Sequence, residues 1–182
     1  AVVPLAGDHV TADIAIAFRT PTSAAESVKR EHGSVALEAV DADQVIQVMG
    51  VAKRPPKQIP KRVLAHVMHA RYEEILQLVH AELVESGYLP HLAAGIVLTG
   101  GATRAPGVLE LAEQILGMPV RLGLPQHIQG LLDVRENPSY ATGVGLLLHG
   151  WQMQRAGSAG FHLQSQGASL WSRVRQWFQG NF

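Results

Sequence analysis

The sequence predicts an α/β fold, and three observations carry this prediction. Residues 93–98 are a continuous apolar run of strand length that ends in a Thr-Gly-Gly turn at 99–101, which is typical of a buried parallel strand. A predicted helix at 107–116 and a predicted strand at 120–124 follow, which gives the order strand, helix, strand of a parallel sheet. Residues 61–86 repeat apolar side chains at helical spacing and predict one long amphipathic helix.

Short elements are predicted before this long helix. Residues 1–6 are β-branched at their centre and predict a strand, after which Asp8 is expected to cap a helix that ends before Pro21. A second helix is expected at 24–32, where Gly33 ends it.

Two strands and a turn follow in the prediction. Apolar and polar residues alternate at 35–40 and again at 45–49, which is typical of short, half-buried strands. Residues 50–60 are rich in proline and in basic side chains and predict an irregular turn.

The C-terminal part predicts a packed helix at 138–151, a flexible linker rich in Gly, Ser, Ala and Gln at 152–168, and a last helix from Ser169. We therefore expect one α/β body at 1–151, a linker, and a terminal helix within 169–182. The chain opens at Ala1 without a methionine or the features of a signal peptide, and we expect it to be a segment of a longer protein.

Composition excludes several classes of protein. The chain has 182 residues, 47% hydrophobic, which is enough to bury a core without a disulfide or a metal. Because it has no cysteine, a disulfide framework, a cysteine zinc site and a thiol nucleophile are impossible, as expected in a reducing compartment. Its 15 basic and 15 acidic side chains argue against nucleic-acid binding, and no run approaches the roughly 20 apolar residues of a membrane-spanning helix.

The last helix is the cationic and amphipathic part of the chain. Residues 151–182 contain three arginines and no acidic residue, whereas residues 1–150 carry 12 basic and 15 acidic side chains. One stripe of the helix is apolar, and the opposite side is polar and basic. The apolar stripe comprises Leu170, Trp171, Val174, Trp177 and Phe178, and the polar side includes Arg173 and Arg175. Such a helix lies flat in an anionic membrane surface, or alternatively docks back onto the core.

Two features could serve a nucleoside. Gly100 and Gly101 follow a buried strand, where a backbone without Cβ atoms lets a flat or phosphorylated ligand approach, although a simple tight turn has the same signature. Glu26 and Lys29 lie one helical turn apart, so the carboxylate could accept hydrogen bonds from ribose hydroxyls while the lysine stem covers a base. The alternative is a solvated ion pair.

A basic cluster forms a local positive field that favours an acidic peptide or a phosphate, unless it is only a solvated surface. It comprises Lys53, Arg54, Lys57, Lys61 and Arg62, with Arg71 further along the long helix. His66 and His69 lack the spacing of a zinc motif and are expected to be surface residues.

The order of these motifs resembles the FtsA family of bacterial cell-division proteins, in the actin and sugar-kinase ATPase superfamily. The resemblance covers the whole chain. It rests on residues 7–15 (GDHVTADIA), the Glu26-x-x-Lys29 helix, residues 96–102 (IVLTGGA) and the terminal helix. The resemblance implies the second half of an actin-like (sugar kinase/actin/Hsp70-type) fold, subdomains IIA and IIB, with IIB at about 34–90, starting just beyond the acidic phosphate loop of IIA.

The resemblance also implies ligands. Gly100, Gly101 and Ala102 would form the adenosine motif, and Glu26 and Lys29 would flank the nucleoside of ATP, bound with magnesium in the full-length protein. Because neither phosphate loop of the family lies in this chain, its ATP site is expected to be incomplete, and the chain is expected not to be an enzyme.

The partners implied are the acidic and apolar C-terminal tail of the tubulin-like FtsZ, an anionic membrane, further copies of the protein in actin-like filaments, and other division proteins. Arg71, in the segment ARYEE, matches the family's motif for the FtsZ tail, and Lys57 aligns with a basic position nearby; Lys61 and Arg62 belong to the same cluster. The protein would tether FtsZ filaments to the cytoplasmic face of the inner membrane at the division septum. One alternative is half of a small-molecule kinase of the same superfamily, which would leave the amphipathic terminal helix unexplained. The other is a lipid-binding module without a nucleotide role.

Overall fold

The computed structural model describes residues 1–155, except 42, 53–54 and 131. The chain divides into two compact units, residues 1–142 and 143–182. Several predictions lie outside the described residues. They concern Lys53 and Arg54 of the basic cluster, residues 156–168 of the linker, the terminal helix, and its expected membrane-binding residues Leu170, Trp171, Arg173, Val174, Arg175, Trp177 and Phe178.

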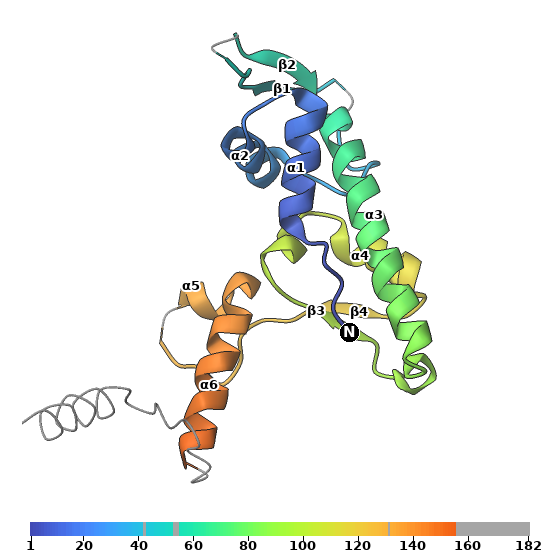
Figure 1. The fold of residues 1–182 in the computed structure, drawn as a ribbon, viewed down its shortest axis with the longest axis vertical. Helices are drawn as coiled ribbons and strands as arrows, with labels where there is room; N and C mark the ends of the chain where they lie inside the picture. The colour runs from blue at the N-terminus through green and yellow to red at the C-terminus, as the bar shows by residue number, and fades with distance from the viewer. Residues whose placement is uncertain (42, 53–54, 131, 156–182) are drawn as a thin grey trace, which may run out of the picture. The chain divides into compact units, whose positions relative to one another are not determined.

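Three helices form the core of the first unit. Helix α1 (Gly7–Phe18) lies between α2 (Thr22–His32) and α3 (Lys61–Glu85), as Figure 1 shows. Each helix places apolar side chains three or four residues apart on the face that meets its neighbour, which is the reason the sequence predicts all three. The fully buried side chains between α1 and α3 are Val10, Ile14, Leu64 and Met68.

Two small sheets flank these helices. Strands β1 (Val45–Val48) and β2 (Lys57–Pro60) pair antiparallel, and Ile46 faces Ile59 on the side that packs on the core. Strands β3 (Ile96–Leu98) and β4 (Val120–Leu122) pair in parallel, and α4 (Val108–Leu116) connects them. The parallel strand–helix–strand unit that the sequence predicts is thus confirmed, with shorter strands.

Short helices complete the described chain. They are the 3-10 helices η1 (Leu89–His91), η2 (Gly101–Arg104) and η3 (Pro138–Tyr140), and the α-helices α5 (Leu132–Arg135) and α6 (Ala141–Arg155). Arg155 places its guanidinium 4.6 Å from the ring centre of Trp151, one turn earlier on α6. No helix within the described part of the chain is both long and apolar enough to cross a bilayer.

The structure corrects two strand predictions. Residues 1–6 form no strand, because no neighbouring segment pairs with them among the described residues. Residues 35–40 form no strand either, because the amides of Val35 and Ala36 both donate to the carbonyl of Pro106, at 2.8 and 3.4 Å. This contact holds the segment as a loop against the start of α4.

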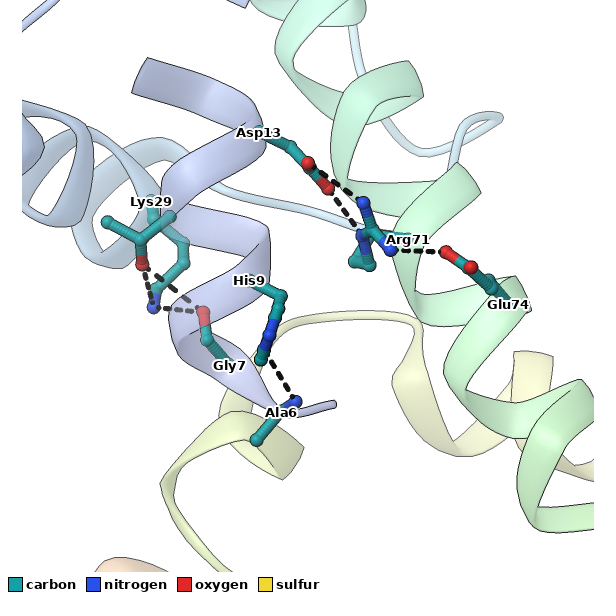
Figure 2. A network of polar contacts seen from close by, with 8 residues as sticks. Ala6, Gly7, His9, Asp13, Lys29, Arg71 and Glu74 are labelled. Atoms are coloured by element: carbon teal, nitrogen blue, oxygen red, sulfur yellow. Dashed lines mark hydrogen bonds and ion pairs between the residues drawn. The ribbon is translucent and has the colours of Figure 1, made fainter. Parts of the chain in front are cut away.

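Three predicted boundaries are also wrong. The expected turn at 50–60 contains β2, because β1 supplies the backbone partners that residues 57–60 need. The expected linker begins too early, since α6 continues through residues 152–155. The N-terminal cap of α1 is Ala6 instead of Asp8, and the amide of Ala6 donates to Nδ1 of His9 at 3.2 Å (Figure 2).

Candidate functional site

A polar cluster joins the first turn of α1 to α2. The ammonium Nζ of Lys29 lies 2.6 Å from Glu26 Oε2 and donates to Thr11 Oγ1 at 2.7 Å. It also donates to the carbonyl of Gly7 at 3.0 Å (Figure 2). Glu26 Oε2 also accepts the hydroxyl of Thr11 at 2.5 Å. The ion pair predicted from sequence is therefore formed, and it is anchored to α1 by a third residue.

The helix η2 approaches this cluster closely. A Cβ atom added to Gly7 would lie 3.4 Å from Cβ of Ala102 and 3.8 Å from Nζ of Lys29. The buried hydroxyl of Tyr72, on α3, donates to the carbonyl of Ala102 at 2.7 Å. Three of the five predicted nucleoside residues, Glu26, Lys29 and Ala102, are thus brought to one region around the start of α1.

The other two predicted residues, Gly100 and Gly101, lie in the turn at the carboxyl end of β3. Gly100 has a φ of +100°, which glycine adopts at little cost, and its carbonyl accepts the hydroxyl of Thr103 at 2.7 Å. A Cβ on Gly101 would lie 3.1 Å from the hydroxyl oxygen of Ser139. A Cβ on Gly100 would meet no atom within 4 Å, so the backbone is open at Gly100, whereas Ser139 fills the space beside Gly101. Gly100 lies at the sheet edge where α/β proteins bind ligands.

The charges of the cluster favour an ionised carboxylate. Partial burial acts to raise the pKa of Glu26, but the hydrogen bonds from Lys29 and Thr11 and the charges of Lys29 and Arg30 outweigh it, so the pKa lies below its ordinary value. Burial, with a contribution from the charge of Glu26, raises the pKa of Tyr72 to about 12. At neutral pH the cluster thus presents a carboxylate acceptor beside a neutral phenol.

Acidification is expected to destabilise the chain through Glu26. Because its pKa is lower in the folded chain than in the unfolded one, its contribution is fully present above its unfolded value of 4.5 and is lost as the pH falls through the folded value. Urea unfolding at pH about 6 and about 3 should therefore show a smaller acid-induced loss for Glu26→Gln than for wild type. The matched control is Glu31→Gln, an exposed carboxylate on the same helix, which should keep the wild-type loss. Equal losses in wild type and Glu26→Gln would contradict the prediction.

A second feature is an open groove of about 320 Å³ between α1 and α3. Its apolar lining includes Ile16, which is 76% exposed. Its polar wall is Arg71, whose Nε and Nη2 donate to Asp13 at 2.5 and 2.9 Å and whose Nη1 contacts Glu74 (Figure 2). The remaining lining residues are Ala17, Val67 and Ala70.

The guanidinium of Arg71 is already matched by two carboxylates. The hydrogen bond with Asp13 raises the pKa of Arg71, partial burial opposes this, and the charges of Asp13 and Glu74 add to the rise. The family resemblance implies that Arg71 contacts an acidic tail, and the structure shows its guanidinium already ion-paired within the chain. An acidic ligand of this groove must therefore replace Glu74 or share Arg71 with it.

The other predicted basic residues lie apart from Arg71. Lys57 is exposed on β2, and Lys61 and Arg62 open α3. Because an α-helix rises about 1.5 Å per residue, Lys61 lies about 15 Å from Arg71 along the helix axis, which is the length of about five residues of extended peptide. The structure thus separates Lys61 and Arg62 from Arg71 along α3 and does not gather these charges at one point.

No three His, Asp or Glu side chains in the described part of the chain are grouped so that they could hold a metal ion. His69 Nδ1 lies 2.9 Å from the carbonyl of Val35, an ordinary structural contact.

Sequence reasoning missed three residues of these sites: Thr11, Asp13 and Tyr72. Thr11 and Asp13 lie on a helix that the sequence predicts, but their partners are distant in the chain, with Arg71 58 positions after Asp13. Tyr72 is the residue after Arg71, and its hydroxyl finds its acceptor, the carbonyl of Ala102, 30 positions later in the chain.

Known proteins resemble this chain in sequence. A family model described as "Cell division protein FtsA" matches residues 1–145. The chain is 45% identical over 188 residues to the cell division protein FtsA of Pseudomonas aeruginosa, and 38% identical over 190 residues to that of Escherichia coli K12. Each comparison covers 100% of this chain and 45% of the relative, so the chain spans about half the length of the curated relatives it matches.

Solved structures resemble it in fold. MreB 5 of Spiroplasma citri bound to AMPPNP superposes with a TM-score of 0.64 and 18% identity, over 87% of this chain and 47% of that one. The same protein bound to ADP gives 0.61 and 19%, over 87% and 48%. These likenesses establish the actin-like α/β fold. The family model, which matches residues 1–145, shows that the chain belongs to the FtsA family of cell-division proteins.

Proposed function

We propose that this chain is the part of an FtsA-type adaptor that binds the FtsZ tail in the α1–α3 groove and tethers it to the inner membrane through the C-terminal helix. The observation that carries the proposal is the groove itself, an exposed apolar surface with one arginine at its wall. The tail of FtsZ is acidic and apolar, so its apolar side chains would cover Ile16 while a carboxylate pairs with Arg71.

The membrane part of the proposal rests on the sequence of the terminal helix. Its apolar stripe contains two tryptophans, and its polar side contains two arginines, each worth about 1 kcal/mol beside an anionic leaflet. Ordering the helix costs a comparable amount to what its partial immersion gains, so one copy binds weakly and reversibly. Self-association into actin-like filaments, or clustering on an FtsZ filament, supplies the multivalency for firm attachment at the division septum.

The nucleotide part of the proposal concerns ATP, with magnesium, in the full-length protein. The turn leaves backbone open at Gly100, and the Glu26–Lys29 pair lies beside the start of α1, close to Ala102, so these residues fit the nucleoside side of the ligand. The MreB 5 structures were determined with AMPPNP and with ADP, which supports a nucleotide here. ATP would hold the two halves of the fold together, and the chain acts as an adaptor for FtsZ and other division proteins and not as an enzyme.

Vesicle co-sedimentation tests the adaptor function. The chain is mixed with phosphatidylcholine vesicles that contain phosphatidylglycerol and with a fluorescent peptide of the FtsZ C-terminal tail. Each chain is artificially dimerised so that two terminal helices act together, and we expect the dimerised wild type to pellet with the peptide. Trp177→Glu should leave both in solution, because a charge in the apolar stripe opposes immersion. Arg71→Ala should still pellet but leave the peptide behind, because the groove loses its cation.

A third variant tests the charge of the groove in the opposite direction. Glu74→Gln removes a carboxylate that competes for Arg71, so it should carry down more peptide than wild type, by about threefold. If wild type, Arg71→Ala and Glu74→Gln carry down equal amounts of peptide, the groove is not the site. If the dimerised wild-type chain stays in solution, the proposed membrane attachment is wrong, and half of a small-molecule kinase becomes the favoured alternative.

A further inference from the structure

The buried Thr11 contacts both members of the Glu26–Lys29 ion pair. Its side chain is 4% exposed on α1, and its hydroxyl accepts from Lys29 Nζ at 2.7 Å while donating to Glu26 Oε2 at 2.5 Å. A threonine hydroxyl has one proton to donate, and the carbonyl of Gly7 is further away, at 3.2 Å, so the proton belongs to the contact with Glu26. Thr11 thus fixes both members of the ion pair.

The ammonium of Lys29 has no donor left for a ligand. It carries three N–H groups, and Glu26, Thr11 and Gly7 accept from it within 3.0 Å. The contribution of Lys29 to a ligand is therefore its stem, while its charge holds the site together.

The free hydrogen-bonding capacity of the cluster lies on Glu26. Within the described part of the chain, the contacts of its carboxylate are made by Oε2, which leaves Oε1 available, and the side chain is 41% exposed. An ionised carboxylate only accepts hydrogen bonds, and its lowered pKa keeps it ionised. The ligand group that fits it is a hydroxyl donor such as a sugar hydroxyl.

We infer that Thr11 is a positioning residue that holds Glu26 for recognition of a ribose hydroxyl and so sets the preference for ribonucleotides over deoxyribonucleotides. The inference rests on the proposed nucleotide function and names a role for a residue that does not itself contact the ligand. Without the Thr11 hydroxyl, Lys29 still pairs with Glu26, but the carboxylate loses the contact that fixes its rotation. Its outward oxygen then no longer meets the sugar in one geometry.

The test measures affinities of the full-length protein for magnesium ATP and magnesium 2′-deoxy-ATP by isothermal titration calorimetry. A hydrogen bond from a hydroxyl to a carboxylate corresponds to about tenfold in affinity, so wild type should prefer ATP by about that factor. In Thr11→Val, which keeps the shape of the side chain, the preference should fall to below about threefold. Thr11→Ser, the matched control, keeps the hydroxyl and should keep the wild-type preference.

A second readout does not need nucleotide. The hydroxyl of Thr11 lowers the pKa of Glu26, so the carboxyl of Glu26, followed by NMR in the ligand-free protein, should titrate at higher pH in Thr11→Val and at the wild-type pH in Thr11→Ser. Should Thr11→Val fail to fold, Thr11→Ala, which also lacks the hydroxyl and has good helix propensity, takes its place.

The outcomes separate the two proposals. If wild type binds ATP and Thr11→Val keeps the full preference for ATP over 2′-deoxy-ATP, the role of Thr11 is overturned while nucleotide binding stands. Wild type that binds neither nucleotide would overturn the nucleotide function and the inference together. A lost preference in Thr11→Ser as well as in Thr11→Val would also overturn the inference, because the serine hydroxyl should suffice.

Discussion

Gly107→Ala is expected to destabilise the chain by about 2–5 kcal/mol, one of the largest effects of a single methyl group in this fold. Gly107 precedes α4 with a φ of +88°, a conformation that costs an L-residue about 1–2 kcal/mol. An added Cβ would also lie 2.5 Å from the amide nitrogen and 2.6 Å from Cβ of Ala36. Since the amide of Ala36 is held by Pro106, the loop cannot move away without losing that hydrogen bond.

Gly117→Ala is the matched control for this prediction. Gly117 ends α4 with a φ of +68°, but an added Cβ would meet no atom within 4 Å. Gly117→Ala should therefore lower the free energy of unfolding only by the cost of the left-handed backbone conformation, about 1–2 kcal/mol. Urea unfolding of the two variants and wild type measures the difference. If Gly107→Ala costs no more than Gly117→Ala, the loop at 34–37 is not packed against α4 as the structure has it.

The helices of this chain are predictable because their signal is local. Apolar spacing along α1, α2 and α3 is repeated over eleven or more residues, and each repetition adds to the prediction. A strand of three or four residues offers two alternating positions at most, so 35–40 and β1 look alike in sequence. Whether such a segment forms a strand depends on its distant partner. β1 pairs with β2, whereas the amides of residues 35 and 36 donate to the carbonyl of Pro106.

In the candidate sites too, contacts within one helix are predictable from the sequence, and contacts between different elements are not. The Glu26–Lys29 pair is three residues apart on one helix, so its spacing predicts the contact directly. The contacts of Thr11 with α2, of Tyr72 with Ala102 and of Arg71 with Asp13 join different elements, and one sequence contains no signal for them. The consequence is largest at Arg71. Glu74 lies three residues later on the same helix, within reach by spacing, but the pairing with Asp13 on α1 forms only when the chain is folded.

Ile14→Ala is expected to cost about 2–5 kcal/mol of the free energy of unfolding, while Ile16→Ala costs about 0.5 kcal/mol or less. The two isoleucines lie on the same helix, but Ile14 is fully buried in the hydrophobic core, so its loss leaves a cavity that close-packed neighbours fill only in part. Ile16 is 76% exposed at the groove, so its truncation removes little packing. Thermal and urea unfolding of both variants measure this contrast.

The same pair also separates stability from recognition. If the FtsZ tail covers the α1–α3 groove, Ile16→Ala should weaken peptide binding by about fivefold or more, because the lost apolar contact is worth about 1 kcal/mol or more. The exposure of Ile16 would then be explained by binding of the FtsZ tail, since the stability of the chain does not require an apolar side chain there. A stable Ile16→Ala that binds the peptide as wild type does would place the peptide elsewhere, and Ile16 would be an isolated exposed side chain of the kind that folded proteins carry without a function.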